Sequence, residues 1–302
     1  MIIKAVAGTE QAGLRLDDGI KSLFPHLSKS LIRRIIDWGG CTIGTEKARV
    51  ASRRLRAGDE ITLGIMEKEN CRELAYDAVD MLHEDENCLA VCKGAGINCQ
   101  RTPYQLKGTV EYAVEMYLKR SGSREPARVI HRLDRGTSGV MIFPKNRRFA
   151  AYLSALLKDG KMEKTYLALT TGVPPLPEWE TDAPIAKIAS SRYGVAIPGK
   201  EARTRFRVLA EGSGATLVVA RPLTGRTHQI RVHLAHHGLP IVGDTTYGGA
   251  TAPRMMLHCL SMAFPTEKGR HIRITAPVDD EFVSVCKEWV IESGDGAGII
   301  KL

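Results

Sequence analysis

The spacing of short apolar runs between residues 79 and 292 constrains the fold of this chain more than any other feature. The runs are separated by turns that contain Gly or Pro, and few helical segments interrupt them. Strand-like runs lie at 88–92, 139–143, 165–170, 202–209, 215–220 and 271–274, and candidate helices lie at 109–120, 147–158 and 228–237. Because strands and helices do not alternate regularly, a parallel βαβ arrangement is not expected. We predict an α+β domain over 80–292, built on a mixed, mostly antiparallel sheet.

The first 65 residues have a different pattern and predict a separate, small α+β module. A helix is expected at 16–24, where Pro25 ends it, and a second at 29–38. Ser28 is the expected N-cap of the second helix, and the Gly39-Gly40 pair is its expected end. Short strands are predicted at 41–43 and 60–63. Residues 66–79 are interpreted as a linker, and the Gly-rich segment 293–302 as a loosely held tail.

Positive charge is concentrated in this first module. The chain has a net charge of +9, and eight Lys or Arg stand against two acids between His26 and Ala57. Such an excess favours a polyanionic partner, and nucleic acid is the leading one. The candidate phosphate contacts are Lys29, Arg33, Arg34, Arg53 and Arg54.

Other classes of protein fit the sequence poorly. No apolar run is long enough to span a membrane, and residues 1–9 lack the features of a signal peptide, so we expect a cytoplasmic protein. Seven cysteines, an odd number without a Cys-x-x-Cys pair, predict free thiols. The histidines between 228 and 237 lack the spacing of a zinc site, so no metal is expected.

Asp134 stands out because it lies between two apolar segments that are expected to be strands, Val129-Ile130 and 140–143. A carboxylate in such a place is partly desolvated and needs a partner. The flanking Arg132 and Arg135 could supply one, and an Asp that pairs with a neighbouring Arg is common in loops without any function. Asp134 alone therefore leaves the structural and the functional interpretation open.

The segments that accompany Asp134 favour the functional interpretation. They are Lys93–Gly96, His131–Gly139, Lys164–Leu169, Gly225–Leu234 with Gly243-Asp244 close behind, and more weakly Arg254–Cys259. In combination, and over roughly residues 82–277, the chain resembles the RluA-type pseudouridine synthases, with their His-Arg-Leu-Asp-x-x-Thr-Ser-Gly, Lys-x-Tyr-x-Ala, Gly-Arg-x-His-Gln-Ile-Arg and Leu-His motifs. The resemblance implies the pseudouridine synthase fold and an enzyme that isomerises uridines in RNA without a cofactor.

The resemblance also implies roles for individual residues. Asp134 matches the essential carboxylate, which either adds to the sugar or acts as a base at C2′ through a glycal; the sequence leaves both open. Arg231 matches the arginine that pairs with this Asp, and Tyr166 matches the residue that stacks on the target base. Those three form the predicted catalytic set.

Five further residues have supporting roles by the same resemblance. Leu257 matches an apolar wall of the base pocket, and Lys93 and Lys164 match positions that support the site. His131 and Arg132 are candidates to fill the space left by the extruded base or to hold phosphate.

The chain departs from the family pattern after Lys93. Gly94 replaces the usual Pro, and Gln100 stands near the position of a His. No catalytic part is therefore expected of this segment.

The first module resembles the S4-type RNA-binding domain. The matching residues are Arg15-Leu16-Asp17, Ser28-Lys29-Ser30, Gly39-Gly40 and Gly58–Ile61, while Thr42-Ile43-Gly44 departs from the usual Val-Asn-Gly. Family members with this module mostly modify large-subunit ribosomal RNA, which is the substrate we expect, with tRNA as the alternative. A non-catalytic RNA-binding or ribosome-assembly factor is the alternative of another class. A glycosidase would need a second carboxylate. We expect a monomer.

Overall fold

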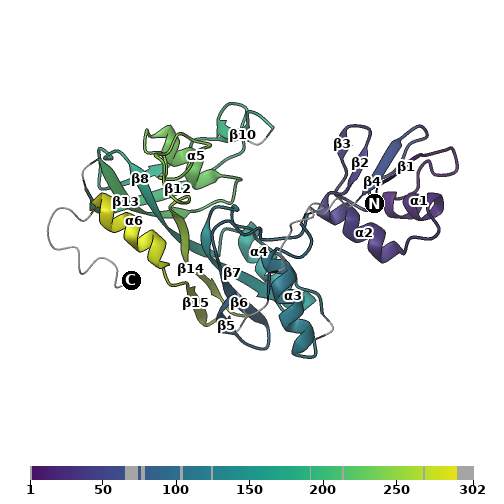
Figure 1. The fold of residues 1–302 in the computed structure, drawn as a ribbon, viewed down its shortest axis with the longest axis horizontal. Coiled ribbons are helices and arrows are strands. Elements are labelled where there is room, and N and C mark those ends of the chain that lie inside the picture. The colour runs from purple at the N-terminus through teal and green to yellow at the C-terminus, as the bar shows by residue number, and fades with distance from the viewer. Residues whose placement is uncertain are drawn as a thin grey trace. The chain divides into compact units, whose positions relative to one another are not determined.

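The computed structural model of the protein describes residues 2–64, 74–75, 79–102, 105–123, 125–190, 192–212, 214–267 and 269–290. The chain divides into two compact units, Met1–Tyr76 with Gln100–Met116, and Asp77–Cys99 with Tyr117–Leu302 (Figure 1). The linker predicted at 66–79 lies mostly outside the described residues, and the tail predicted at 293–302 lies wholly outside them.

Residues 2–64 of the first unit form a four-stranded antiparallel sheet and two helices. The sheet order is β1 (Ile2–Val6), β4 (Glu60–Gly64), β2 (Cys41–Ile43) and β3 (Glu46–Lys47), and the helices are α1 (Leu16–Leu23) and α2 (Lys29–Trp38). Both helices were predicted. The Ser28 side chain accepts a hydrogen bond from the amide of Leu31, and Gly39 ends α2 at φ +81°. The apolar faces of α1 and α2 share one core with β2 and β4.

The second unit is built on a nine-stranded sheet within the described residues. Its order is β5 (Asp80–Glu84), β6 (Cys88–Lys93), β7 (Ser138–Pro144), β14 (Leu257–Pro265), β8 (Glu163–Thr171), β13 (Ala215–Pro222), β12 (Thr204–Glu211) and β9 (Glu178–Thr181), with β15 (His271–Thr275) paired to β14. Only β7 and β14 pair in parallel; the other neighbours are antiparallel. This confirms the predicted mixed, mostly antiparallel sheet.

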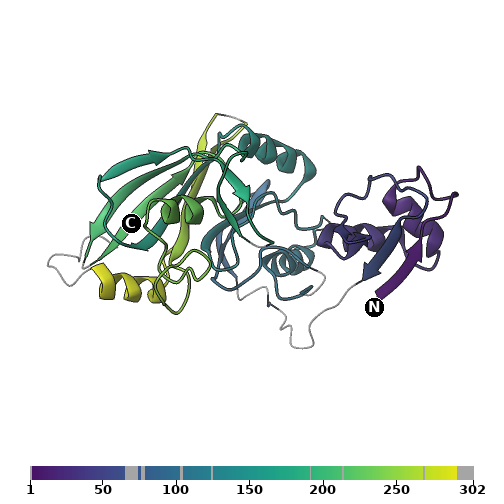
Figure 2. The same cartoon turned by 90° about the horizontal axis from the view of Figure 1, so that it is seen from above.

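Four helices and a hairpin complete the described structure of the larger part of the chain. They are α3 (Val110–Arg120), α4 (Arg147–Lys158), α5 (Gln229–His236), α6 (Asp280–Val290), and the pair β10 (Ile185–Lys187) and β11 (Tyr193–Val195). Both α5 and α6 pack against β13, and in the two views α6 lies along that part of the sheet (Figures 1 and 2). Strand β13 is therefore buried along nearly its whole length.

Two expectations differ from the structure near the site. The strand expected at Val129-Ile130 is absent, and these residues form partly buried irregular chain. The apolar run is only two residues long and follows Pro126, which has no amide to donate to a sheet. The segment 254–259, treated above only as a motif, instead begins the central strand β14, which contacts three neighbouring strands.

Candidate active site

The loop that carries Asp134 is hydrogen-bonded to Lys93, the last residue of β6, which also binds the turn that follows this strand. Lys93 is fully buried, and its ammonium donates to the carbonyl oxygens of Gly94, Ile97 and Arg135 at 2.9, 2.9 and 3.2 Å. Burial lowers the pKa of Lys93 to about 8, although the charge of Asp134 acts in the opposite direction. Lys93 thus ties the two loops together, and its supporting role in the reaction stays a prediction.

A glycine lets the same loop enter the sheet. Gly139 lies at φ +110°, and a Cβ atom on it would lie 2.2 Å from the carbonyl oxygen of Cys259 on β14. Any side chain here would separate β7 from β14, where His258 and Cys259 pair with Ser138 and Gly139. The small residues at the end of the Asp134 motif are thus required by the closest approach of two parallel strands.

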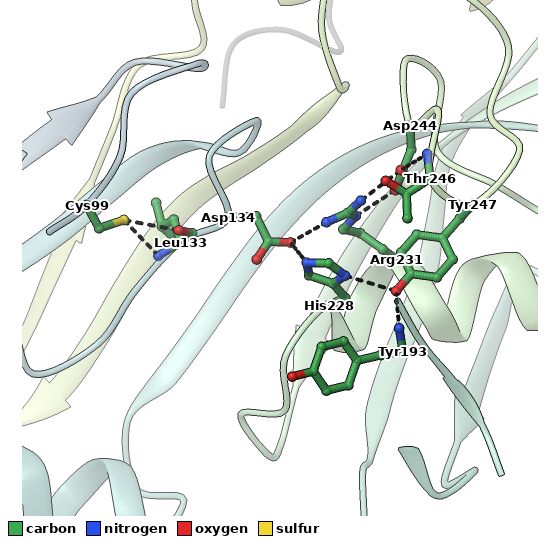
Figure 3. Close-up of polar contacts among 9 residues, drawn as sticks. All are labelled: Cys99, Leu133, Asp134, Tyr193, His228, Arg231, Asp244, Thr246 and Tyr247. Carbon is green, nitrogen blue, oxygen red and sulfur yellow. Dashed lines mark hydrogen bonds and ion pairs between the residues drawn. The ribbon is translucent and has the colours of Figure 1, made fainter. Parts of the chain in front are cut away.

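Arg231 on α5 binds two carboxylates at once. Its Nε and Nη2 donate to Asp244 at 2.6 and 2.9 Å, and its Nη1 donates to Asp134 Oδ2 at 2.9 Å (Figure 3). Burial lowers the pKa of Arg231, but the hydrogen bonds and charges of Asp244 and Asp134 outweigh burial and raise it. Arg231 is therefore a permanent cation, anchored on its buried side by Asp244 and presenting one N–H to Asp134.

The Asp134 carboxylate is held through one oxygen only. Oδ2 accepts from Arg231 and lies 3.8 Å from Nε2 of His228, while no hydrogen bond or ion pair among the described residues reaches Oδ1. The side chain keeps 28% of its surface exposed. The arrangement leaves Oδ1 as the oxygen that can meet a reacting group.

Tyr166 and Leu257 lie on the neighbouring central strands. Tyr166 on β8 is the cross-strand partner of Cys259 on β14, with their hydroxyl and thiol in hydrogen-bond contact. Burial, the Cys259 thiol and the charge of Asp134 raise the pKa of Tyr166, so its hydroxyl stays protonated. Leu257 is buried opposite Ala168. Tyr166 therefore lies close enough to Asp134 for the charge of this carboxylate to affect its pKa.

The remaining predicted site residues, His131, Lys164 and Arg132, differ in burial and in hydrogen bonding. His131 accepts a hydrogen bond at Nε2 from the amide of Ile142 at 3.0 Å, and burial, with the Lys164 charge, lowers its pKa to about 4. It is therefore a neutral group that binds the backbone of β7 at Ile142 and brings no charge to phosphate. Lys164 lies 3.5 Å from the Thr224 carbonyl, and burial lowers its pKa. Arg132 is exposed.

Three residues of the site were not predicted from the sequence: His228, Asp244 and Tyr247. Tyr247 accepts the backbone N–H of Tyr193 at 3.1 Å, and its hydroxyl lies 2.9 Å from Nδ1 of His228. The guanidinium of Arg231 stacks over the Tyr247 ring at 4.9 Å. The Gly243-Asp244 pair next to the arginine motif was the available signal for Asp244, and His228 lies within that motif.

A groove of about 520 Å³ lies beside His228, formed by the β10–β11 hairpin and the loop before α5. Its lining includes Lys187, Lys200 and Arg226 and contains no acid. Such a groove suits a polyanion close to the carboxylate.

The predicted RNA contacts of the first unit divide into two groups. Three of them pair with acids: Lys29 with Asp18, Arg33 with Asp17, and Arg53 with Glu46. The other two have no acid partner among the described residues. Arg34 lies over the ring of Trp38, and Arg54 donates to the Gly13 carbonyl. Arg34 and Arg54 therefore keep the most available charge.

One group of residues has the donor types of a metal site, but it lies apart from the carboxylate. His83, Asp85 and Cys88 bring their ligand atoms within 4.8 Å of one another. Asp85 already accepts hydrogen bonds from the backbone amides of Asn87 and Cys88, so its carboxylate caps a turn.

None of the described helices is long and apolar enough to cross a membrane.

Comparison with known sequences identifies relatives along most of the chain. A sequence model described as RNA pseudouridylate synthase matches residues 87–236. An Aquifex aeolicus protein named an uncharacterized RNA pseudouridine synthase is 33% identical over 262 residues, which cover 83% of this chain and 82% of its own. Ribosomal large subunit pseudouridine synthase C of Escherichia coli O157:H7 is 32% identical over 312 residues, covering 92% and 94% of the two chains.

Solved structures share the fold. Human RNA pseudouridylate synthase domain containing 4 superposes with a TM-score of 0.60 at 22% identity, covering 68% of this chain and 91% of that one. Human RNA pseudouridylate synthase domain containing 1 gives 0.59 at 24% identity, covering 68% and 86%. These likenesses confirm the predicted pseudouridine synthase fold.

Proposed function

The chain belongs to the RNA pseudouridylate synthase family and is an isomerase, and on this premise we propose that it converts uridines of large-subunit ribosomal RNA into pseudouridine with Asp134 as its catalytic carboxylate. The observation that carries the proposal is the one-sided anchoring of Asp134, whose Oδ2 is bound to Arg231 while no hydrogen bond or ion pair from the described residues reaches Oδ1. A carboxylate of this kind is oriented and charged, yet has an oxygen left for chemistry.

The reaction breaks the N1–C1′ bond, turns the uracil and joins C5 to C1′, after which C5 loses its proton and N1 carries one. The departing base tolerates negative charge, so one carboxylate suffices. Asp134 acts through Oδ1, either by adding to C1′ or by taking the proton from C2′, and both routes need the carboxylate in its ionised form. Arg231 supplies the cation that faces its other oxygen. Tyr166 offers its ring to the base, which offsets part of the cost of extruding it from the RNA stack.

The proposed substrate rests on the length of the match as well as on charge. The Escherichia coli relative, named for the large ribosomal subunit, aligns over nearly all of both chains. Residues 1–65 are proposed as an S4-like RNA-binding domain, joined by the linker 66–79 to a catalytic domain over 80–292. The groove with Lys187, Lys200 and Arg226 is proposed to hold RNA phosphates next to the target uridine.

The test of the proposed function is Asp134→Asn. The amide is isosteric and its oxygen still accepts from Arg231, so we expect RNA binding to persist while pseudouridine formation is lost. Ribosomal RNA and tRNA from cells that lack this gene are incubated with the wild type or the variant, and pseudouridines are mapped along both kinds of RNA. Sites that reappear in tRNA instead would favour the alternative substrate. A variant with undiminished product would refute the role of Asp134.

The RNA-binding role of the first unit has its own test. Neutralising Arg34 and Arg54 to Gln should weaken RNA binding and lower the slope of log affinity against log salt by about 1.4 to 1.8, because each lost phosphate contact removes roughly 0.7 to 0.9 from the slope. Arg148→Gln in the second unit, which removes an exposed charge, is the matched control. An unchanged slope in the double variant would show that RNA binds elsewhere.

A further inference from the structure

His228 precedes α5 and has a left-handed backbone conformation, which is rare for residues other than Gly. It is the only non-glycine residue at positive φ in the described part of the chain, with φ 56° and ψ 19°. Its side chain makes no capping hydrogen bond to the helix. Few residues other than Gly adopt this conformation, and Asn, Asp and His are the ones found in it most often. The backbone therefore narrows the choice of residue, while the contacts of the imidazole indicate its task.

The imidazole has two contacts that fix its ring between a phenol and a carboxylate. Nδ1 lies 2.9 Å from the Tyr247 hydroxyl, and Nε2 lies 3.8 Å from Asp134 Oδ2 (Figure 3). The ring also meets Tyr193 and Tyr247 edge to face, with centroids at 5.5 and 5.7 Å. Two tyrosines therefore hold the ring in one orientation, with Nε2 toward Asp134.

The hydrogen-bond network determines where the imidazole proton lies. The Tyr247 oxygen already accepts the backbone N–H of Tyr193, and its own proton is available to Nδ1 of His228. The opposite tautomer would turn the lone pair of Nε2 toward the negative Oδ2 of Asp134. An N–H at Nε2 is thus favoured from both sides.

We propose that His228 is a positioning residue for the isomerisation, which holds Asp134 through Oδ2 together with Arg231 and so directs Oδ1 at the ribose, with its tautomer set by Tyr247. The inference rests on the proposed function of Asp134 and extends it. At 3.8 Å the contact between Nε2 and Oδ2 is longer than a hydrogen bond. Bound RNA shortens it, and two donors on one oxygen then restrict rotation of the carboxylate more than Arg231 alone does. The β10–β11 hairpin contributes through the Tyr193 amide, which links the wall of the basic groove to the orientation of the carboxylate.

Two substitutions separate this role from a purely structural one. In His228→Gln, the side-chain amide can place an N–H where Nε2 stood, but Gln is strained at positive φ. In His228→Asn, the amide stays near Nδ1 and reaches Tyr247 rather than Asp134, while Asn tolerates positive φ. His228→Gly relieves the backbone completely and offers no donor.

The experiment measures single-turnover pseudouridine formation on ribosomal RNA from cells that lack the gene, together with RNA affinity and thermal unfolding. We expect the rate to fall within about tenfold for His228→Gln and by about a hundredfold for the Asn and Gly variants, the cost of a displaced reacting group. Stability should follow the opposite order, with Gln lowest, and RNA affinity should be unchanged. Tyr247→Phe should lower the rate of pseudouridine formation when it is introduced into the wild type. It should not lower the rate further in the His228→Asn variant, which has no imidazole tautomer to set.

The outcomes are distinguishable. If the Asn and Gly variants are as active as the wild type, or more active than Gln, the role of His228 is only in the backbone and the inference is overturned. An additive loss from Tyr247→Phe in the His228→Asn background overturns the assignment of the tautomer to Tyr247. If the wild type itself makes no pseudouridine in ribosomal RNA or tRNA, it is the proposed function that fails.

Discussion

Replacing Arg231 by Met should separate the stability of the site from its chemistry. Arg231 and Asp244 keep 9% and 1% of their side-chain surfaces exposed, and two charge-assisted hydrogen bonds join them. Arg231→Met removes the cation and leaves the Asp244 carboxylate buried without a counter-charge. Breaking one partner of such a pair costs about 3–5 kcal/mol. Asp134 contributes less to this loss, because water can reach its carboxylate.

A second substitution tests that reasoning. Asp244→Asn is neutral and keeps an oxygen for the amide of Thr246, which now bonds to Oδ1 at 3.1 Å. In the Arg231→Met background it should restore at least about half of the lost free energy of unfolding, because the uncompensated charge is gone. Catalysis should stay about a hundredfold or more below the wild type, since the hydrogen bond from Arg231 no longer holds Asp134 Oδ2 in the required direction.

Denaturant titration measures the free energy of unfolding, and single-turnover pseudouridine formation measures the chemistry. Arg231→Lys is the matched control for charge, since one ammonium cannot reach two carboxylates as the guanidinium fork does, and it should also be slow. The reasoning is refuted if Arg231→Met unfolds within about 1 kcal/mol of the wild type. It is refuted equally if the double variant recovers both stability and activity.

Three further substitutions probe the support of the Asp134 loop, each by denaturant titration. Burial disfavours the charged form of His131 and lowers its pKa to about 4. The free energy of unfolding should therefore fall by up to about 3 kcal/mol as pH drops from about 6.5 to 4, and His131→Gln should flatten this pH profile. An equally steep profile in the variant would contradict this. Gly139→Ala should cost about 3 kcal/mol, because its Cβ would lie 2.2 Å from the Cys259 oxygen, whereas Gly136→Ala, whose nearest contact is 3.3 Å, should cost less than about 1. Lys93→Met should cost about 3 kcal/mol, since three carbonyls lose their buried donor, and a neutral result would show that the loop holds without it.

Prediction from the sequence succeeded where a signal is contained in a few neighbouring residues. The Ser28 cap and the Gly39 end determined α2, and short apolar runs without regular helices determined the class of the sheet. It failed where a segment is shaped by distant partners. Strand β14 forms because β7, β8 and β15 all pair with it, and the two apolar residues at 129–130 have no such partner strand among the described residues.

Helix α6 is a different kind of omission. Its apolar residues recur with helical spacing and are buried: Phe282, Val285, Cys286 and Val290. The sequence therefore contains the pattern of this helix, although the helix is not among those predicted above. The linker and tail boundaries stay predictions.

The sequence by itself predicted the chemical inventory of the site: one carboxylate in a motif loop, an arginine to pair with it, a tyrosine proposed to meet the base, and a basic module proposed to bind RNA. Those features are local, because each belongs to a short segment that can be recognised by its own residues and motif. Only the tertiary structure decided that Arg231 bridges two acids, that His131 is a neutral acceptor within the fold, and that Oδ2 rather than Oδ1 of Asp134 is held. Such contacts join loops and helices far apart along the chain, and their geometry comes from the packing of the sheet that brings those loops together.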